Sequence, residues 1–236
     1  EFRPTYPEAL FAWLVGLCTE HEAAWDCATG SGQAAVGLSQ HFTKIIATDA
    51  SAEQVAHASG PANVEFRVAP AEASGLENHS IDLVTVAQAA HWFELPRFYA
   101  EIERVLKPGG VLALWGYGRL CLPNGMDEIF QRFYSETIGP YWPPERKLID
   151  DGYRSLAFPF AEIAAPAFFI EVEWNLPRLM DYLSTWSALK RYRADPGSDP
   201  LPALMSELQP LWGKPDDALL LKWPLFLRVG RLQAPV

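Results

Sequence analysis

The sequence has few cysteines, few basic residues and no long apolar run. Its three cysteines, Cys18, Cys27 and Cys121, share no C-x-x-C spacing and cannot all pair, so we expect reduced thiols, no disulfide framework and a cytoplasmic setting. No apolar run approaches the ~18 residues of a membrane span, and no charged-then-apolar leader opens the chain. Membrane insertion is therefore not expected, although a chain that begins at Glu1 rather than Met can lack residues upstream.

The shortage of basic residues argues against two classes of partner. The 236 residues include 19 Lys and Arg against 29 Asp and Glu, a formal net charge of -10, which would repel nucleic acid and anionic membranes. The excess is uneven: residues 1–117 contain 6 basic and 14 acidic side chains, and residues 118–236 contain 13 and 15. We expect neither nucleic acid nor a membrane as a partner.

The first half alternates between strand and helix patterns, and 49% of the residues are apolar, enough for a sizeable core. The predicted strands are 23–27, 44–48, 63–68, 81–87 and 111–115. The predicted helices are 6–21, 33–41, one that begins after an N-cap at Ser51, and 96–106. With two later strands, this order predicts a doubly wound, mostly parallel, seven-stranded α/β sheet of the Rossmann-like kind.

The second half is rich in proline and less regular. Its patterns predict helices at 126–138, 176–193 and 201–212, strands at 168–174 and 219–232, and irregular chain from the turn at 140–144 to Pro166. We expect one domain over residues 1–236, in which residues 118–236 supply a helical cover and the last two strands.

The turn after the first predicted strand is the most informative stretch. Gly30 and Gly32 let the backbone approach a ligand, and Asp49, 19 positions after Gly30, ends the second strand where a carboxylate can accept both ribose hydroxyls. Gly30-x-Gly32-x-x-Ala35 also satisfies the dinucleotide pattern, so an NAD-dependent oxidoreductase is an alternative. Asp26 favours a nucleoside that carries an ammonium group, because it would repel a pyrophosphate.

Five motifs occur in the order found in one enzyme family. They are Asp26 to Gly32, Ile46 to Asp49, Ala69 to Glu72, Asp82 to Phe93, and Val105 to Gly110. With these motifs the chain resembles the class I S-adenosylmethionine-dependent methyltransferases, and within them the type 11 group that includes trans-aconitate methyltransferase-like enzymes. The resemblance implies a methyltransferase fold with residues 23–117 as the cofactor-binding core.

The resemblance also implies which residues bind S-adenosylmethionine. Those expected around the methionine part are Asp26, Ala28, Thr29, Gly30 and Gly32, with Ala87 and Gln88 near the sulfonium. Those expected around the adenosine are Asp49 at the ribose, Ala50 on the adenine face, and Ala71 and Glu72 at the adenine edge. The family usually has glycine where Ala28 stands, and we expect the pocket to tolerate this methyl group, with an affinity no higher than glycine would allow.

His91 follows the fourth predicted strand, whose end faces the reacting methyl group in this architecture. It is a candidate general base, and the alternative is a buried, hydrogen-bonded histidine with Trp92 and Phe93 as a lid. A carboxylate acceptor is already ionised at neutral pH and would need no base. The other histidines have no metal-ligand spacing, so no metal is expected.

Arginines and aromatic residues gather after Gly118, where the acceptor would bind. Arginine binds carboxylates in a bidentate way and aromatic walls exclude water, so a small anionic or aromatic acceptor is expected. The residues in question are Arg119, Arg132, Arg146, Arg154, Arg191, Arg193, Tyr141, Trp142, Tyr153, Trp186 and Tyr192. The predicted function is methyl transfer from S-adenosylmethionine to a small molecule, with a carboxylate as one candidate. A non-catalytic S-adenosylmethionine-binding protein is a further alternative.

Overall fold

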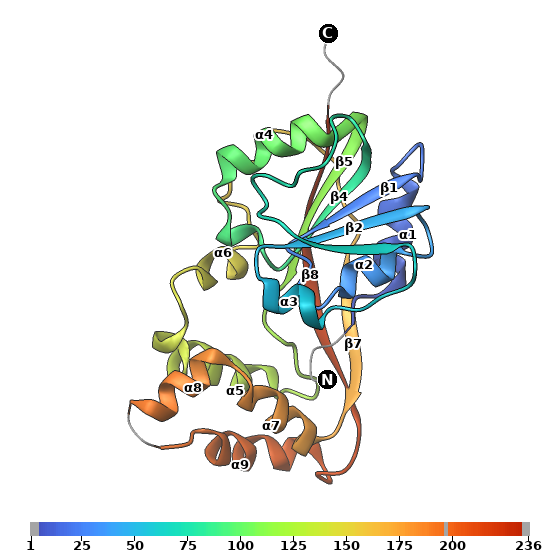
Figure 1. Ribbon diagram of the computed structural model, residues 1–236. Coiled ribbons are helices and arrows are strands. Elements are labelled where there is room, and N and C mark those ends of the chain that lie inside the picture. The colour runs from blue at the N-terminus through green and yellow to red at the C-terminus, as the bar shows by residue number, and fades with distance from the viewer. Residues whose placement is uncertain (1–4, 196–197, 233–236) are drawn as a thin grey trace. The chain divides into compact units, whose positions relative to one another are not determined.

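The computed structural model describes residues 5–195 and 198–232, and its contacts group into two compact units (Figure 1). The sheet unit comprises Thr5–Gly118, Leu148–Phe168 and the chain from Leu225 onward. The helical unit comprises Arg119–Lys147 and Phe169–Pro224. The first break, after Gly118, falls close to the change in charge and proline content. The prediction that residues 1–236 act as one domain stays a prediction.

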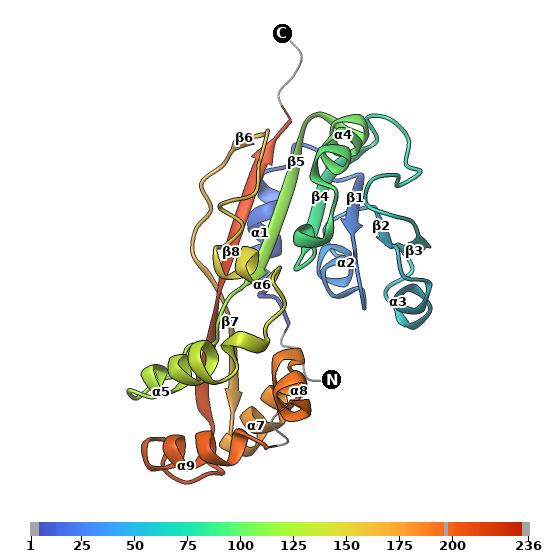
Figure 2. The same cartoon turned by 90° about the vertical axis from the view of Figure 1, so that its left-hand side faces the viewer.

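The predicted doubly wound, mostly parallel sheet is confirmed. Seven strands form the path β3-β2-β1-β4-β5-β8-β6, and β7 pairs with β8 beside it (Figure 2). Strands β1 to β5 pair in parallel along this path, whereas β8 runs antiparallel to both β5 and β6. The strands are β1 (Ala23–Cys27), β2 (Lys44–Asp49), β3 (Val64–Val68), β4 (Ile81–Ala87), β5 (Leu106–Tyr117), β6 (Ala161–Glu162), β7 (Phe168–Trp174) and β8 (Leu219–Arg231). The short β6 was not predicted.

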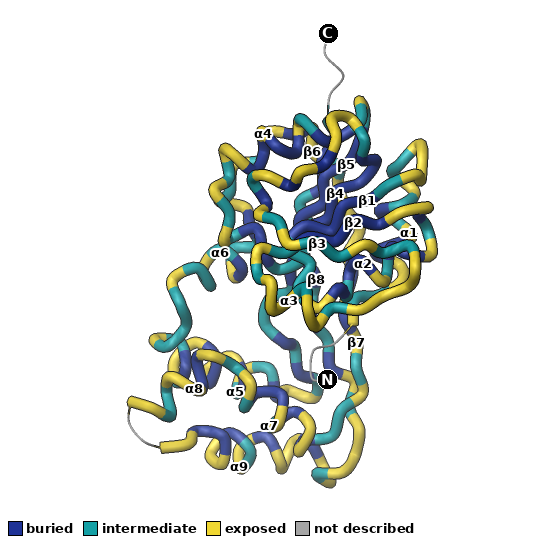
Figure 3. The backbone as a smooth tube through the Cα atoms, viewed as in Figure 1, coloured by how far each residue is buried: buried dark blue, intermediate teal, exposed yellow. Residues whose placement is uncertain are grey.

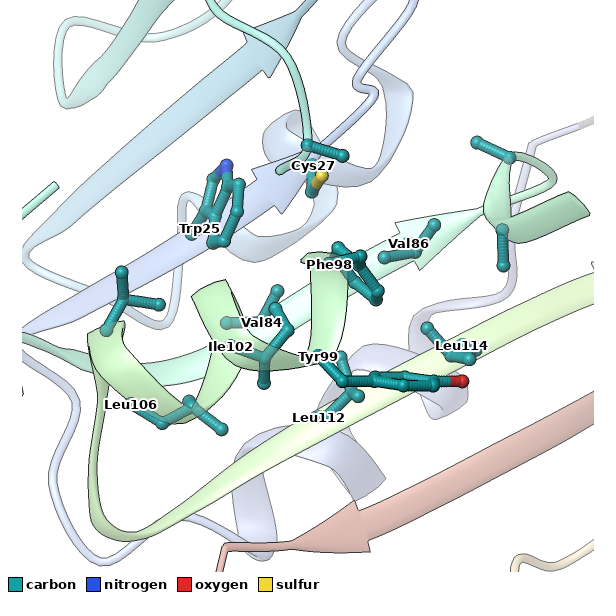
Figure 4. Packing of buried hydrophobic residues seen from close by; sticks show 14 of the residues in the cluster. Trp25, Cys27, Val84, Val86, Phe98, Tyr99, Ile102, Leu106, Leu112 and Leu114 are labelled. Atoms are coloured by element: carbon teal, nitrogen blue, oxygen red, sulfur yellow. The ribbon is translucent and has the colours of Figure 1, made fainter. Parts of the chain in front are cut away.

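Helices cover both faces of the sheet. On one face, α4 (Leu95–Val105) packs Phe98 and Ile102 into an apolar cluster with side chains of the central strands, among them Trp25 (Figure 4). On the other face, Phe11 of α1 (Glu8–Gly16) makes an edge contact with Trp115, with ring centroids 6.4 Å apart. The central strands β1, β4 and β5 are therefore buried almost throughout (Figure 3).

The parallel register places the ends of β1, β2 and β4 at one edge of the sheet. Asp26 pairs in register with Ala47 of β2 and with Thr85 of β4. The two helices that begin near this edge are α2 (Gln33–Leu38) and α3 (Ala52–His57). Ser51 is the N-cap of α3, as predicted, and its hydroxyl accepts a hydrogen bond from the Gln54 backbone N–H.

The helical unit corrects one sequence prediction. The helix expected over 176–193 is two helices, α7 (Leu176–Ser184) and α8 (Ser187–Ala194). They separate because the Thr185 hydroxyl donates to the Tyr182 carbonyl oxygen, at 2.7 Å, and because Trp186 adopts an extended backbone. The Trp186 ring then packs against Trp142, with centroids 5.3 Å apart.

The remaining helical segments follow the predictions more closely. The segment predicted as 126–138 forms α5 (Asp127–Arg132), which continues as a π-helical turn over Phe133–Thr137, and α9 (Leu201–Trp212) matches its prediction. Helix α6 (Arg146–Asp150) lies in chain that was expected to be irregular. Within residues 5–195 and 198–232, no helix is long and apolar enough to span a membrane.

Candidate active site

The turn between β1 and α2 contains three residues with left-handed backbone. Ala28, Gly30 and Gly32 have φ angles of 56°, 55° and 87°. A Cβ on Gly32 would lie 2.9 Å from the Phe66 ring, so packing as well as φ requires glycine there. A Cβ on Gly30 would meet only the Gln54 Oε1 atom, at 4.0 Å. The space beside Gly30 therefore fits the close approach of a ligand to this turn.

Asp26 ties this turn to the sheet and to α2. Its carboxylate is 1% exposed and accepts hydrogen bonds from the Thr85 hydroxyl at 2.9 Å, the Thr29 hydroxyl at 2.6 Å and the Ala35 backbone N–H at 3.1 Å. Burial raises the pKa of Asp26 to about 6, although these hydrogen bonds oppose the shift. Asp26 thus shapes the turn, and its contact with a ligand ammonium group stays a prediction.

Asp49 lies directly against the glycine turn. Its Oδ2 atom accepts a hydrogen bond from the Gly30 backbone N–H, and its Oδ1 atom accepts one from the Ser51 backbone N–H, both at 2.9 Å. Each carboxylate oxygen has more than one acceptor position, so these bonds leave capacity for hydroxyl donors. The structure brings Asp49 and the turn together, and Ala50 follows at the same edge. The contacts expected for both residues with adenosine stay predictions.

The loop between β3 and β4 contains Ala71 and Glu72, which are expected at the adenine edge. Ala71 is buried, and the Glu72 Oε1 atom accepts a hydrogen bond from the Glu94 backbone N–H at 3.0 Å. The same loop is held to α4 by Glu101, whose carboxylate accepts hydrogen bonds from the Ser74 backbone N–H and hydroxyl and from the Arg104 guanidinium. We call Ser74, Glu101 and Arg104 the Glu101 clamp.

The Glu101 clamp was not predicted from sequence, because its members are 27 and 3 positions apart and match no motif. Hydrogen bonds from Arg104 and Ser74 lower the pKa of Glu101 to about 2. Arg104 also donates to the Leu76 carbonyl oxygen at 2.7 Å. A partly buried charge network therefore holds the loop that contains the two expected adenine contacts.

Replacing Glu101 with glutamine should reduce the free energy of unfolding at pH 7 by about 1 to 3 kcal/mol, because Arg104 and Ser74 lose a charged partner. The pKa of Glu101 is lower in the folded protein, so its contribution is present above pH 4.5 and is lost as the pH falls through about 2. Urea denaturation at pH 7 and at pH 3 measures the effect. Glu103→Gln, on the exposed side of the same helix, is the control. If both variants lose the same free energy of unfolding, the stabilising role of the Glu101 clamp is contradicted.

The end of β4 contains a second non-glycine residue with left-handed backbone. Gln88 has a φ of 58°, its backbone N–H donates to the Trp115 carbonyl oxygen at 2.8 Å, and its side-chain amide donates to the Tyr117 carbonyl oxygen at 3.3 Å. Ala28 and Gln88 thus directly follow the neighbouring strands β1 and β4, in a backbone conformation that costs free energy. Such strain concentrates at functional sites. The contacts of Ala87 and Gln88 with the cofactor stay predictions.

His91 lies in a 3-10 turn, Ala90–Trp92, directly after β4. Its Nδ1 atom is 2.8 Å from the hydroxyl oxygen of Tyr153, which is fully buried. The next residue, Trp92, is 65% exposed, and its ring centroid lies 4.7 Å from that of His91. The partnership with Tyr153 could not be predicted, because the two residues are 62 positions apart.

The arginines expected near the acceptor differ in their surroundings. Three of them form ion pairs inside the helical unit, namely Arg119 with Asp127, Arg132 with Glu207, and Arg193 with Asp199. Arg146 stacks on the Trp142 ring, 4.8 Å from its centroid. Tyr153 and Arg154 belong to the sheet unit instead.

In the part of the chain that the structure describes, no group of three His, Cys, Asp or Glu side chains could hold a metal ion.

Comparison with known proteins identifies the family. The family described as "Methyltransferase domain" matches residues 25–114. A protein of Dictyostelium discoideum whose name assigns it to the methyltransferases is 38% identical over 211 residues, which cover 88% of this chain and 80% of that protein. An uncharacterized methyltransferase of Mycobacterium tuberculosis is 34% identical over 114 residues, 48% of this chain and 46% of that protein.

A solved structure extends the likeness to the whole chain. The protein is from Anaeromyxobacter dehalogenans, its description assigns it to the type II methyltransferases, and it is 41% identical with a TM-score of 0.95 over 100% of both chains. This likeness and that to the Dictyostelium protein set aside the NAD-dependent alternative. The chain belongs to the class I S-adenosylmethionine-dependent methyltransferases.

Proposed function

We propose that this enzyme transfers the methyl group of S-adenosylmethionine to the carboxylate of a small molecule. The observation that carries the proposal is the contact of the His91 Nδ1 atom with the Tyr153 hydroxyl, at 2.8 Å. A histidine that acts as a general base is commonly oriented by a carboxylate, which also stabilises the imidazolium that forms. A carboxylate acceptor needs no proton removed, so it suits a site in which a hydroxyl lies against Nδ1 of the histidine.

S-adenosylmethionine supplies an electrophilic methyl group on a sulfonium, so the work left to the protein is binding and alignment. We assign the ribose hydroxyls to Asp49, which already borders the turn through Gly30. The adenine edge belongs to Ala71 and Glu72. The turn from Asp26 to Gly32 encloses the methionine part, with the Ala28 methyl group as the departure from the family pattern.

At the end of β4, Ala87 and Gln88 lie beside the methionine part, and His91 faces the acceptor. The Gln88 side chain is held by the Tyr117 carbonyl oxygen. We propose that residues 23–117 form the cofactor-binding core and that residues 118–236 supply the acceptor cover and the last two strands of a single methyltransferase domain.

The test is a product assay with matched acceptors. The enzyme is incubated with S-adenosylmethionine and with trans-aconitate, citrate or benzoate, and in parallel with benzyl alcohol and benzylamine. We expect S-adenosylhomocysteine and a methyl ester from at least one acid, detected by mass spectrometry. Methylation of the alcohol or the amine alone would overturn the carboxylate proposal. Cofactor binding by calorimetry without turnover on any acceptor would favour the non-catalytic alternative.

A further inference from the structure

Tyr153 has an unusual backbone conformation, and its N–H, its carbonyl oxygen and its ring all make contacts. Its φ is 59°, a left-handed value that is unfavourable for a bulky residue. Its backbone N–H donates to the Leu148 carbonyl oxygen at 2.9 Å, and its carbonyl oxygen accepts a hydrogen bond from Arg228 at 3.0 Å. Its ring meets the Phe226 ring edge to face, with centroids 5.0 Å apart. These contacts determine where the hydroxyl lies.

Arg228 is itself fixed within the sheet unit. It forms an ion pair with Glu162 and donates to the Leu156 carbonyl oxygen at 2.7 Å. Tyr153 is therefore bound to β8 through Arg228. These contacts keep its backbone in the strained conformation. A residue in a costly conformation whose hydroxyl contacts a candidate active-site histidine is a candidate positioning residue.

We propose that Tyr153 is a positioning residue that holds His91 with its proton on Nε2. Of the two groups, the imidazole nitrogen is the stronger base and the phenol is a ready O–H donor, so the 2.8 Å contact is best made with Tyr153 as the donor and Nδ1 as the acceptor. In a neutral imidazole, the hydrogen bond at one nitrogen decides which nitrogen carries the proton. Neutral His91 therefore carries its proton on Nε2.

This tautomer makes His91 a hydrogen-bond donor at Nε2 toward an anionic oxygen. A donor suits a carboxylate, which it would orient, and does not suit a neutral alcohol that must lose a proton. The inference rests on the proposed function for the identity of the acceptor. The tautomer itself is a property of the free protein, and it can be measured without any acceptor.

The tautomer is measured by two-dimensional 15N–1H correlation of the histidine ring nitrogens at pH 8, above the ordinary pKa of an imidazole group. The His91 signals are assigned with His91→Asn. His79 is an internal reference of the opposite kind, because its Nδ1 lies 3.0 Å from the Leu106 carbonyl oxygen, which can only accept a hydrogen bond. We expect the proton on Nε2 in His91 and on Nδ1 in His79. A proton on Nδ1 of His91 overturns the proposal.

Tyr153→Phe removes the hydroxyl and keeps the ring against Phe226. We expect its His91 signals to move toward a mixture of both tautomers, and benzoate binding in the presence of S-adenosylhomocysteine to weaken about five- to tenfold. S-adenosylhomocysteine binding should not change. An unchanged His91 tautomer in this variant would contradict the positioning role, and the wild-type tautomer decides the question alone if the variant does not fold.

Tyr99→Phe is the matched control. Tyr99 is also buried in the sheet unit, and its hydroxyl donates to the Ala157 carbonyl oxygen at 2.6 Å. Its loss should reduce stability by a similar amount and leave the His91 tautomer unchanged. Equal tautomer changes in both variants would mean that a general loosening of the unit is responsible. Failure of the wild-type enzyme to bind S-adenosylhomocysteine would instead contradict the proposed function, whichever tautomer is found.

Discussion

Asp26→Asn should stabilise the folded enzyme at neutral pH by up to about 3 kcal/mol. Burial raises the pKa of this carboxyl from 3.8 to about 6, so folding favours its protonated form. The favourable contribution of Asp26 to the free energy of unfolding is fully present below pH 3.8 and is lost as the pH rises through about 6. Each unit of pKa difference corresponds to about 1.4 kcal/mol. Asparagine is neutral at every pH and avoids this loss, although it also gives up charged hydrogen bonds.

The hydrogen-bond partners of Asp26 can accept an amide. The asparagine oxygen can receive the Thr29 hydroxyl and the Ala35 backbone N–H, while its NH₂ group faces the Thr85 hydroxyl, which can turn to accept. The measurement is the free energy of unfolding of wild type and variant between pH 4 and pH 7.5. The free energy of unfolding of the variant should exceed that of wild type by an amount that grows as the pH rises. A difference that is constant over this range would contradict the raised pKa.

Glu101→Gln is the matched control for this pH dependence, because the pKa of Glu101 is lowered rather than raised. The free energy of unfolding of Glu101→Gln should fall further below that of wild type as the pH rises from about 2 through 4.5. This pH range lies below the range in which Asp26 titrates. The two buried carboxylates should therefore give pH profiles of opposite sign. Groups that titrate in all three proteins cancel when each variant is compared with wild type.

Asp49→Ala should weaken S-adenosylmethionine binding by about 1 to 3 kcal/mol, or roughly 5- to 150-fold. The substitution removes the acceptor of the Gly30 backbone N–H, so it loosens the turn in addition to removing the proposed ribose contact. Asp49→Asn separates the two effects in part, since the amide keeps the size of the side chain and one acceptor oxygen. We expect its affinity to lie between those of wild type and Asp49→Ala.

Calorimetric titration with S-adenosylmethionine and with S-adenosylhomocysteine measures these affinities. Glu53→Gln is the control, because Glu53 is an exposed carboxylate in the first turn of the nearby helix α3. It should bind both ligands as wild type does. If Asp49→Ala binds S-adenosylmethionine as tightly as this control, the ribose assignment is wrong.

Local patterns determined most of the sheet unit. Strands β1 and β4 match their predicted bounds because each is a short, buried run bordered by turn residues, and the α3 cap at Ser51 depends on residues only three positions apart. The family also followed from sequence, because the motifs between Asp26 and Gly110 lie in segments of a few residues each. In these cases the interactions that decide the structure are between neighbours along the chain.

The tertiary structure decided what depends on distant residues. The break between α7 and α8 is an exception, because it involves a local bond from the Thr185 hydroxyl to Tyr182 that the helical pattern through 176–193 does not show. The Glu101 clamp and the His91–Tyr153 contact join segments 27 and 62 positions apart. The sequence by itself thus determined the family, the sheet and the glycine turn. Only the tertiary structure decided how Asp26 is buried and which hydroxyl orients His91, because burial and hydrogen bonding depend on segments that folding brings together.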